Sequence, residues 1–188
     1  MSNLKELTWE HHKDAERQEF VKVLMSGKIN PDLYATYLWN QHKKYDLLEA
    51  LAGALGLLDD LPDIRRKVKI EQDFLELWKD DSPPQITKST QHYIMHMKEI
   101  IQDRNAIMAH VYVLHMGDLS GGQMIARKAP GAGNMYKFDT DTTALKEAIR
   151  AKINDDMAEE AKYCFTASTN LFKELMELDI EPYLEQTN

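Results

Sequence analysis

Two short segments of this sequence combine residue types that could perform chemistry, and the first is a glycine cluster. Gly117, Gly121 and Gly122 surround Asp118 inside a stretch whose other residues favour a helix. Each glycine inside a helix costs roughly 0.5 to 1 kcal/mol relative to alanine, so three of them need an offsetting benefit. Glycines four residues apart remove the side chains from one helix face, so a large flat ligand could lie against the backbone with Asp118 beside it. A helix break or close helix packing explains any single glycine, but the cluster favours a ligand surface.

The second segment lies near the N-terminus, where His12 and Glu16 are four residues apart. On a helix this spacing lets the carboxylate accept one imidazole N–H, which leaves the other ring nitrogen to bind a metal. Lys5 lies two turns earlier on the same line and could pair with an acidic group of the ligand. A histidine beside an apolar stripe is also often an ordinary half-buried side chain, so both interpretations remain open here. The apolar stripe is expected to contain Leu4, Leu7, His11 and Ala15.

The other metal-ligating residue types are sparse. His92 and His96 are four residues apart, but no third ligand lies near them in the sequence, so we expect them on a solvated helix face. Cys164 is the only cysteine, which excludes an internal disulfide and any multi-cysteine metal site. We expect its thiol to be buried and inert, because its neighbours offer no positive charge to activate it.

Composition and length predict one globular domain over residues 1–188. The chain has 43% hydrophobic and 29% charged residues, with a mean hydropathy of -0.53. Its net charge of -8 argues against nucleic acid or anionic membrane surfaces as partners. No apolar run approaches the ~18 residues of a membrane span, and the first 13 residues are too charged for a signal peptide. We therefore expect a cytoplasmic protein.

The elements that must position these residues are expected to be helices only, because valine is rare while Leu, Ala, Lys, Glu, Met and Gln abound. Prolines and glycines divide the chain, since proline cannot continue a helix. Asn3, with Glu6 three residues later, and Asn30, before Pro31, are the expected N-caps of the first two helices. The glycine-rich stretch 131–133 leads into a loop. The predicted helices cover residues 3–25, 30–57, 62–80, 87–104, 105–128, 142–152 and 155–178.

The glycine cluster and the His12 segment both resemble one known protein family. Residues 117–123, Gly-Asp-Leu-Ser-Gly-Gly-Gln, resemble the distal-helix signature of heme oxygenases, and residues 12–20 resemble their proximal-helix pattern. Segments 145–150 and 159–172 fit the same family in order and spacing. The resemblance implies an all-α, single-domain helical bundle with heme b, cofactor and substrate at once, between a proximal and a distal helix. It also implies cleavage of heme by O₂ and electrons to biliverdin, expected as the IXα isomer, with CO and Fe²⁺ released.

The resemblance also implies roles for individual residues. His12 becomes the axial ligand of the iron, and Glu16 accepts its other ring proton. Gly117 and Gly121 let the distal backbone lie over the porphyrin, while Asp118 and Tyr45 hold the waters that deliver protons during catalysis. Lys5, Lys146 and Arg150 would meet the propionates. The remaining expected heme contacts are Tyr112, Gly122, Phe165 and Phe172.

The sequence departs from the family pattern just before the glycine cluster. Where the family often has Tyr-x-Arg-Tyr-Leu, this chain has Tyr112-Val-Leu-His-Met116, so the arginine is missing. The loss bears on the distal water network and on which carbon is cleaved, and His115 is the residue that could substitute. A heme carrier or sensor without turnover is the alternative function. A fold relative that binds no heme, similar to thiaminase-like helical proteins, is a third.

The expected partners are heme, O₂ and an electron donor. The resemblance is to the soluble bacterial, cyanobacterial or phage type, because the C-terminal membrane anchor of the animal enzymes is not seen in this sequence. It therefore implies reduced ferredoxin as the donor, and a biliverdin reductase as a possible downstream partner. An acidic ferredoxin would need a local basic patch on this acidic chain. Candidates for that patch are Lys5, Lys43, Lys44, Arg127, Lys128, Lys146 and Arg150.

Overall fold

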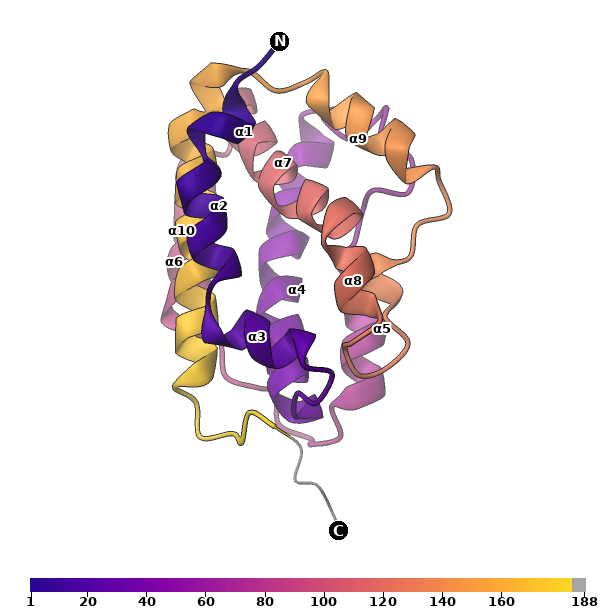
Figure 1. Cartoon of the computed structure of the whole chain (residues 1–188). Helices are drawn as coiled ribbons and strands as arrows, with labels where there is room; N and C mark the ends of the chain where they lie inside the picture. The colour runs from indigo at the N-terminus through magenta and orange to yellow at the C-terminus, as the bar shows by residue number, and fades with distance from the viewer. Residues whose placement is uncertain (184–188) are drawn as a thin grey trace.

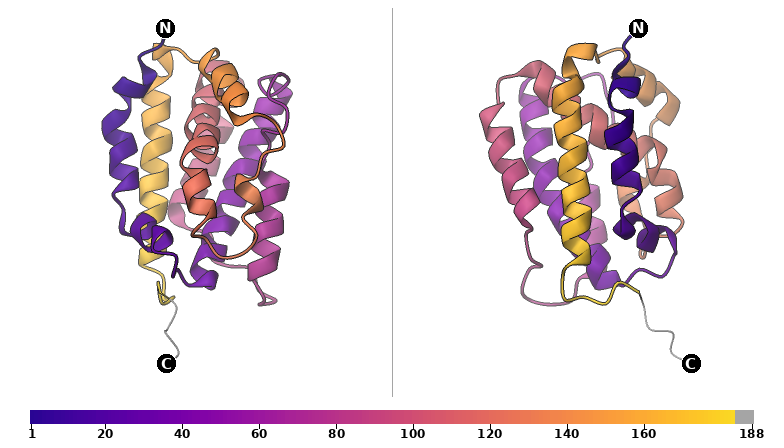
Figure 2. Two further views of the ribbon diagram at one scale, coloured as in Figure 1. Left: turned by 45° about the vertical axis from the view of Figure 1, so that its right-hand side comes forward. Right: turned by 60° about the vertical axis from the view of Figure 1, so that its left-hand side comes forward.

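The computed structural model describes residues 1–183, and the elements in that part of the chain are helical, as predicted. The longest helix, α4 (Pro31–Ala54), runs through the middle of the bundle, with α7 (Arg104–Ser120) and α10 (Ala158–Met176) packed against it (Figure 1). Two further helices, α5 (Lys67–Leu77) and α6 (Lys88–Glu99), also pack on α4, and α6 contacts α10 (Figure 2). The short helices of the N-terminal segment lie along α10, and α9 (Thr142–Arg150) lies against α7.

Polar side chains cap four of the long helices at their first turns. Asn30 accepts a hydrogen bond from the Asp32 amide at 2.9 Å, and Pro31 follows it, so this predicted N-cap is confirmed. Similar caps begin α6, α7 and α9. They are formed by the side chains of Thr87, Asp103 and Asp141.

The N-terminal segment differs from the single helix predicted over residues 3–25. It forms α1 (Leu4–Leu7), α2 (Trp9–Glu16) and α3 (Glu19–Met25). The Thr8 hydroxyl donates to the Leu4 carbonyl at 2.8 Å, and Thr8 takes the buried position one turn after Leu4. Leu7 is 46% exposed, so its place in the predicted apolar stripe is wrong, and Asn3 does not cap the helix with its side chain. Its backbone amide donates to Asp155 Oδ1 instead.

Three other predicted helices end earlier or divide. The segment 105–128 divides at Gly121 into α7 and α8 (Gly122–Ala126), and the segment 155–178 begins with the 3₁₀ helix η2 (Asp155–Met157) before α10. The segment 62–80 contains only the eleven residues of α5 as helix. A second 3₁₀ helix, η1 (Asn134–Tyr136), forms where a loop was predicted. The last five positions of the predicted 1–188 domain lie outside the described residues.

One hydrophobic core fills the space between these helices. It draws on α3, α4, α7 and α10 together, with residues such as Phe20, Leu38, Ile107 and Leu171 almost fully buried. Cys164 is also fully buried, and burial raises the pKa of its thiol to about 12, as expected for an inert cysteine. None of the helices described is both long and apolar enough to cross a membrane.

Candidate functional site

A cavity of about 670 Å³ opens between the N-terminal helices and α7. Figure 1 shows α2 and α7 facing one another in front of α4, and residues from α1, α4, α9 and α10 complete the walls. The volume is in the range of pockets that bury a small-molecule ligand. Most residues singled out in the sequence meet here. They are Lys5, His12, Glu16, Tyr45, Tyr112, Gly117, Asp118, Gly121, Arg150, Phe165 and Phe172.

His12 lies on the α2 wall of the cavity. Its Nε2 is 2.7 Å from Glu16 Oε1, which is the contact that the four-residue spacing predicts. The carboxylate engages one ring nitrogen and leaves the second as a candidate ligand atom. The imidazole stacks on Phe165 of α10 with the ring centroids 5.3 Å apart, and Trp9 meets it edge-on. These two aromatic rings fix the plane of the imidazole.

Two of the three clustered glycines leave the opposite wall open. A Cβ atom at Gly117 would meet nothing within 4 Å, and one at Gly121 would meet only the Gly117 carbonyl at 3.8 Å. Gly122 is different, because a Cβ there would overlap the ring of Tyr136. Gly122 does not line the cavity, and its lack of a side chain lets Tyr136 pack against α8. Gly117 and Gly121 therefore form the part of the cavity wall that has no side chains.

Asp118 is buried beside this glycine face and is held by α4. Tyr45 donates a hydrogen bond from its hydroxyl to Asp118 Oδ2 at 2.7 Å, so the two residues predicted to act together do lie together. Burial raises the pKa of Asp118 to about 7, although His115, the Tyr45 hydrogen bond and Arg66 all favour the ionised form. A carboxyl group with this pKa is present in both protonation states near neutral pH and can give or take a proton.

His115 lies one turn before Asp118 and is completely buried. Its Nε2 donates to Glu49 Oε2 at 2.8 Å, and its other ring nitrogen, Nδ1, has no hydrogen-bond partner among the described residues. The His115 and Tyr45 rings are 5.1 Å apart. The histidine therefore belongs to the same buried polar group as Asp118 and Tyr45.

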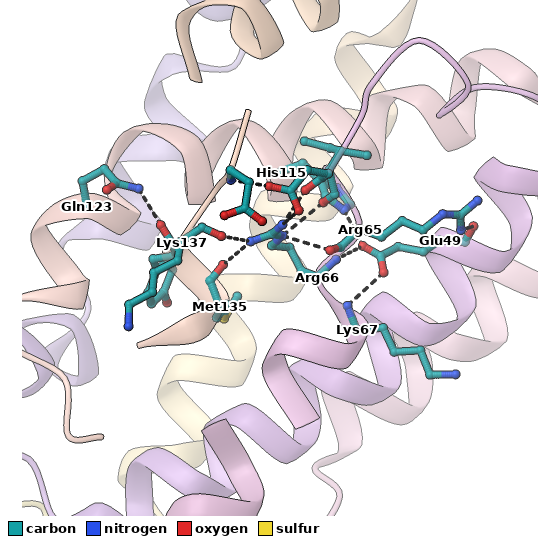
Figure 3. Close-up of polar contacts among 12 residues, drawn as sticks. Glu49, Arg65, Arg66, Lys67, His115, Gln123, Met135 and Lys137 are labelled. Atoms are coloured by element: carbon teal, nitrogen blue, oxygen red, sulfur yellow. Dashed lines mark hydrogen bonds and ion pairs between the residues drawn. The ribbon is translucent and has the colours of Figure 1, made fainter. Parts of the chain in front are cut away.

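Figure 3 shows how Glu49 and Arg66 extend this buried group toward the 131–139 loop. The Glu49 carboxylate accepts the backbone N–H groups of Arg66 and Lys67 as well as the His115 imidazole. Burial raises the pKa of Glu49, but together these donors lower it by more, so the net shift of the pKa is downward. Glu49 therefore carries its charge in the interior, where three donors satisfy it.

The fully buried Arg66 side chain holds the loop in place. Its guanidinium donates to the carbonyls of Met135 and Lys137, at 3.2 and 2.7 Å (Figure 3). It also lies over the Phe138 ring, 3.8 Å from the centroid. The loop contains Tyr136, whose carbonyl accepts from Gln123 of α8 and whose ring lines the cavity. Arg66 thus positions part of the cavity wall through the loop.

The expected basic residues do not form one patch. Lys5 and Arg150 line the cavity, while Lys146 lies one turn before Arg150 outside the lining.

Lys44 is only 1% exposed, so its inclusion in a surface patch is wrong; its buried ammonium lies over the Tyr93 ring instead. Lys43 stacks on Trp39. Arg127 and Lys128 are exposed beyond α8, near Gly27 at the end of α3.

Several cavity residues were missed by the sequence analysis. Tyr37 and Gln41 precede the predicted Tyr45 at intervals of four on α4, and they line the cavity with it. That spacing on the predicted helix 30–57 was a usable signal. Arg66 and Tyr136 offered no such signal, because their contacts join segments about 70 residues apart.

Comparison with known proteins identifies one family. The family model described as heme oxygenase matches residues 1–177. Heme oxygenase 1 of Rattus norvegicus is 29% identical over 98% of this chain and 74% of its own length. The heme oxygenase structure from Leptospira interrogans has a TM-score of 0.77 and 28% identity, covering 91% of this chain and 97% of that one. Heme oxygenase-1 from Synechocystis sp. PCC6803, solved in complex with heme, has a TM-score of 0.79 and 26% identity, covering 93% and 90%.

The raised pKa of Asp118 predicts a pH-dependent stability. The folded carboxyl keeps its proton up to about pH 7, whereas the unfolded one loses it above about pH 4, so the free energy of unfolding falls as pH rises between these values. Asp118→Asn removes this fall, and relative to the parent it gains up to about 4 kcal/mol between pH 4 and pH 8. Urea unfolding of the heme-free protein across that range measures the difference. Parallel stability profiles for the two proteins would contradict the assignment.

Proposed function

The chain belongs to the heme oxygenase family, whose members degrade heme to biliverdin, and we propose that it carries out this reaction in the cavity between α2 and α7, with the residue roles that follow. The observation that supports the placement best is the pairing of His12 with the open face at Gly117 and Gly121 across one cavity. An imidazole on one wall and a bare helix backbone on the other leave room for a flat ligand between them.

The cavity suits heme in shape and in charge. Phe165 and Phe172 give it apolar wall, and Lys5 and Arg150 are cations on its lining that can pair with two propionates. The open space at Gly117 fits a planar ring that lies close to the α7 backbone. When bound, heme supplies the iron at which O₂ is activated and the ring that is oxidised.

His12 is proposed as the axial ligand of the iron. Glu16 accepts its other N–H, which fixes the tautomer and increases the basicity of the ligating nitrogen. The stacked Phe165 ring and the edge of Trp9 limit rotation of the imidazole, so the ligand is held in one orientation. His11, the neighbouring histidine, does not line the cavity.

Asp118 is proposed as the residue that holds a transferable proton on the distal side. Its pKa of about 7 keeps a large protonated fraction at neutral pH. Tyr45 fixes the orientation of the carboxyl by donating to Oδ2. Burial of both groups keeps bulk water from competing for this hydrogen bond.

His115 is proposed to compensate for the arginine that the family often carries in this segment. Its contact with Glu49 fixes the ring, and the imidazole, one turn from Asp118, opposes the effect of burial on the Asp118 carboxyl. Arg66, which reaches the same region from another element, acts on Asp118 in the same direction. Two residues from different segments therefore favour the ionised form of Asp118.

A reduced ferredoxin is proposed as the electron donor. Lys28, Arg127 and Lys128 are exposed at the ends of α3 and α8, and we call them the α8 basic patch. A Cβ at Gly27 would lie 3.7 Å from the Lys128 side chain, which brings the two segments together. Ile125 and Val21, from the same helices, line the cavity, so a protein bound at this patch would lie beside the ligand. An acidic redox protein is the partner that such a patch would attract.

Turnover is the first test of this proposal. Hemin-loaded protein, reduced under air with ferredoxin, its reductase and NADPH, is expected to lose its Soret absorbance and to form biliverdin. Asp118→Ala is expected to bind hemin but to lose at least about 90% of the biliverdin yield, because a positioned proton donor contributes roughly 100-fold or more. A stable Soret band in the parent would identify a heme carrier or sensor instead. Equal yields from both proteins would remove Asp118 from the mechanism.

Gly117 and Gly122 provide a matched pair of substitutions. Gly117→Leu is expected to leave the heme-free fold at least as stable, since replacing a helical glycine gains roughly 0.5 to 1 kcal/mol. It should weaken hemin binding at least about tenfold, because the side chain fills the open space. Gly122→Ala should instead destabilise the heme-free protein by about 1 to 3 kcal/mol through overlap with Tyr136. Hemin titrations and urea unfolding give both quantities, and the reverse pattern would place the ligand elsewhere.

Charge reversal tests the electron donor. The double variant Arg127→Glu/Lys128→Glu is expected to slow ferredoxin-supported turnover about tenfold at low salt, with a smaller effect at high salt. Turnover supported by ascorbate, which needs no docking surface, should not change. The control variant Lys88→Glu/Lys98→Glu carries the same charge change on α6, which contributes no residue to the cavity lining. Equal slowing by both variants would exclude the α8 basic patch as the docking surface.

A further inference from the structure

A second group of metal-ligating side chains lies outside the cavity. His96 of α6, His110 of α7 and Glu160 of α10 bring their ligand atoms within 4.8 Å of one another. The expectation that His96 lies on a solvated face with His92 is wrong, because the His96 side chain is only 21% exposed and packs against Tyr163 with ring centroids 3.9 Å apart. His92 is exposed and takes no part.

The two imidazoles converge on one oxygen. His110 Nε2 lies 2.7 Å from Glu160 Oε1, and His96 Nε2 contacts the same atom. The other nitrogen of the buried His110, Nδ1, is 2.8 Å from the hydroxyl of the buried Tyr93. A hydrogen bond at the far nitrogen fixes ring orientation in the same way as the outer partner of a metal-bound histidine.

We propose that His96, His110 and Glu160 bind a divalent transition-metal ion, with Zn²⁺ as the representative case. Two imidazoles and one carboxylate form a donor set that zinc and ferrous iron both use, with the remaining positions taken by water. His96 and Glu160 are each 21% exposed, so the site is open to solvent on one side for entry of the ion and for a water ligand. His110 is fully buried and closes the other side.

Binding of an ion requires local movements of these side chains, because their ligand atoms lie within 4.8 Å of one another and are not yet at the spacing of ligands on one ion. Donor atoms around tetrahedral zinc lie about 3.3 Å apart, whereas His110 Nε2 and Glu160 Oε1 are separated by 2.7 Å. An increase of about half an ångström is needed, and the partly exposed Glu160 carboxylate in the first turn of α10 can supply it. Without the ion, the same contacts are hydrogen bonds from the two imidazoles to one carboxylate.

A bound ion would join three helices, because α6 and α7 each pack on α10. It would tie α7, the helix that contains the glycine face, to α6 and α10 at a point two turns before Gly117. Lys44 brings a buried ammonium to the same region, 4.8 Å from the centroid of the Tyr93 ring. Burial lowers the pKa of Lys44.

Zinc titration of the full-length, untagged, heme-free chain tests the site. Because His12 and Glu16 form another histidine–carboxylate pair, the titration is done in both the parent and the His12→Ala background. Calorimetry should show one Zn²⁺ that persists in His12→Ala. His96→Ala and Glu160→Gln should each weaken this binding at least about tenfold. His92→Ala, four residues away on the same helix, is the matched control and should bind as the parent does.

Cobalt gives a readout that depends on the ligands and not on stability. Addition of Co²⁺ to the His12→Ala protein should produce visible ligand-field absorption. A further His96→Ala substitution should abolish this absorption, whereas His92→Ala should preserve it. Far-ultraviolet circular dichroism should be unchanged in all three proteins. Absence of Zn²⁺ binding in the His12→Ala background would overturn the proposal. Binding of both metals that is unaffected by His96→Ala and Glu160→Gln would also overturn it. Neither result bears on heme cleavage, because the three residues lie outside the cavity.

Discussion

The structure depends on one constraint, which is that α7 must present a bare backbone to the cavity while keeping a carboxyl group buried beside it. Gly117 and Gly121 meet the first requirement, and they cost roughly 1 to 2 kcal/mol of helix stability together. Burial of Ile107, Val111 and Leu119, residues of α7 that do not line the cavity, offsets that cost. Asp118 meets the second requirement, and the same burial that excludes water from it raises its pKa to about 7. Core burial of other α7 residues thus stabilises a helix that has no side chains at its glycine positions.

The neighbouring elements follow from this constraint. The long helix α4 supplies Tyr45 to the Asp118 carboxyl and Glu49 to the His115 imidazole, so one helix orients both distal groups. Arg66 then fixes the loop that contains Tyr136, whose ring fills the space that Gly122 leaves. Buried charges seldom add net stability, because their desolvation offsets their attraction. Their value in this protein is that each has a fixed set of hydrogen-bond partners, which gives the cavity wall one geometry.

Much of this arrangement could be predicted from the sequence, where a pattern is local. Helix composition gave the all-α class, and four-residue spacing placed Glu16 against His12. The interactions that escaped prediction depend on tertiary contacts. Leu7 is exposed because Thr8 takes the buried position that follows Leu4, and Lys44 is buried because α4 is covered on several sides. Gly122 and His96 have partners, Tyr136 and Glu160, that lie on distant segments, so no local pattern could assign them.

The structure of the hemin-loaded protein, determined by crystallography, tests the central claim most directly. The account predicts the iron within bonding distance of a His12 imidazole nitrogen, with the opposite face of the ring lying against the backbone at Gly117 and Gly121. An iron bonded to His11 or to another residue would contradict it. So would a porphyrin bound outside the cavity with the glycine face uncovered.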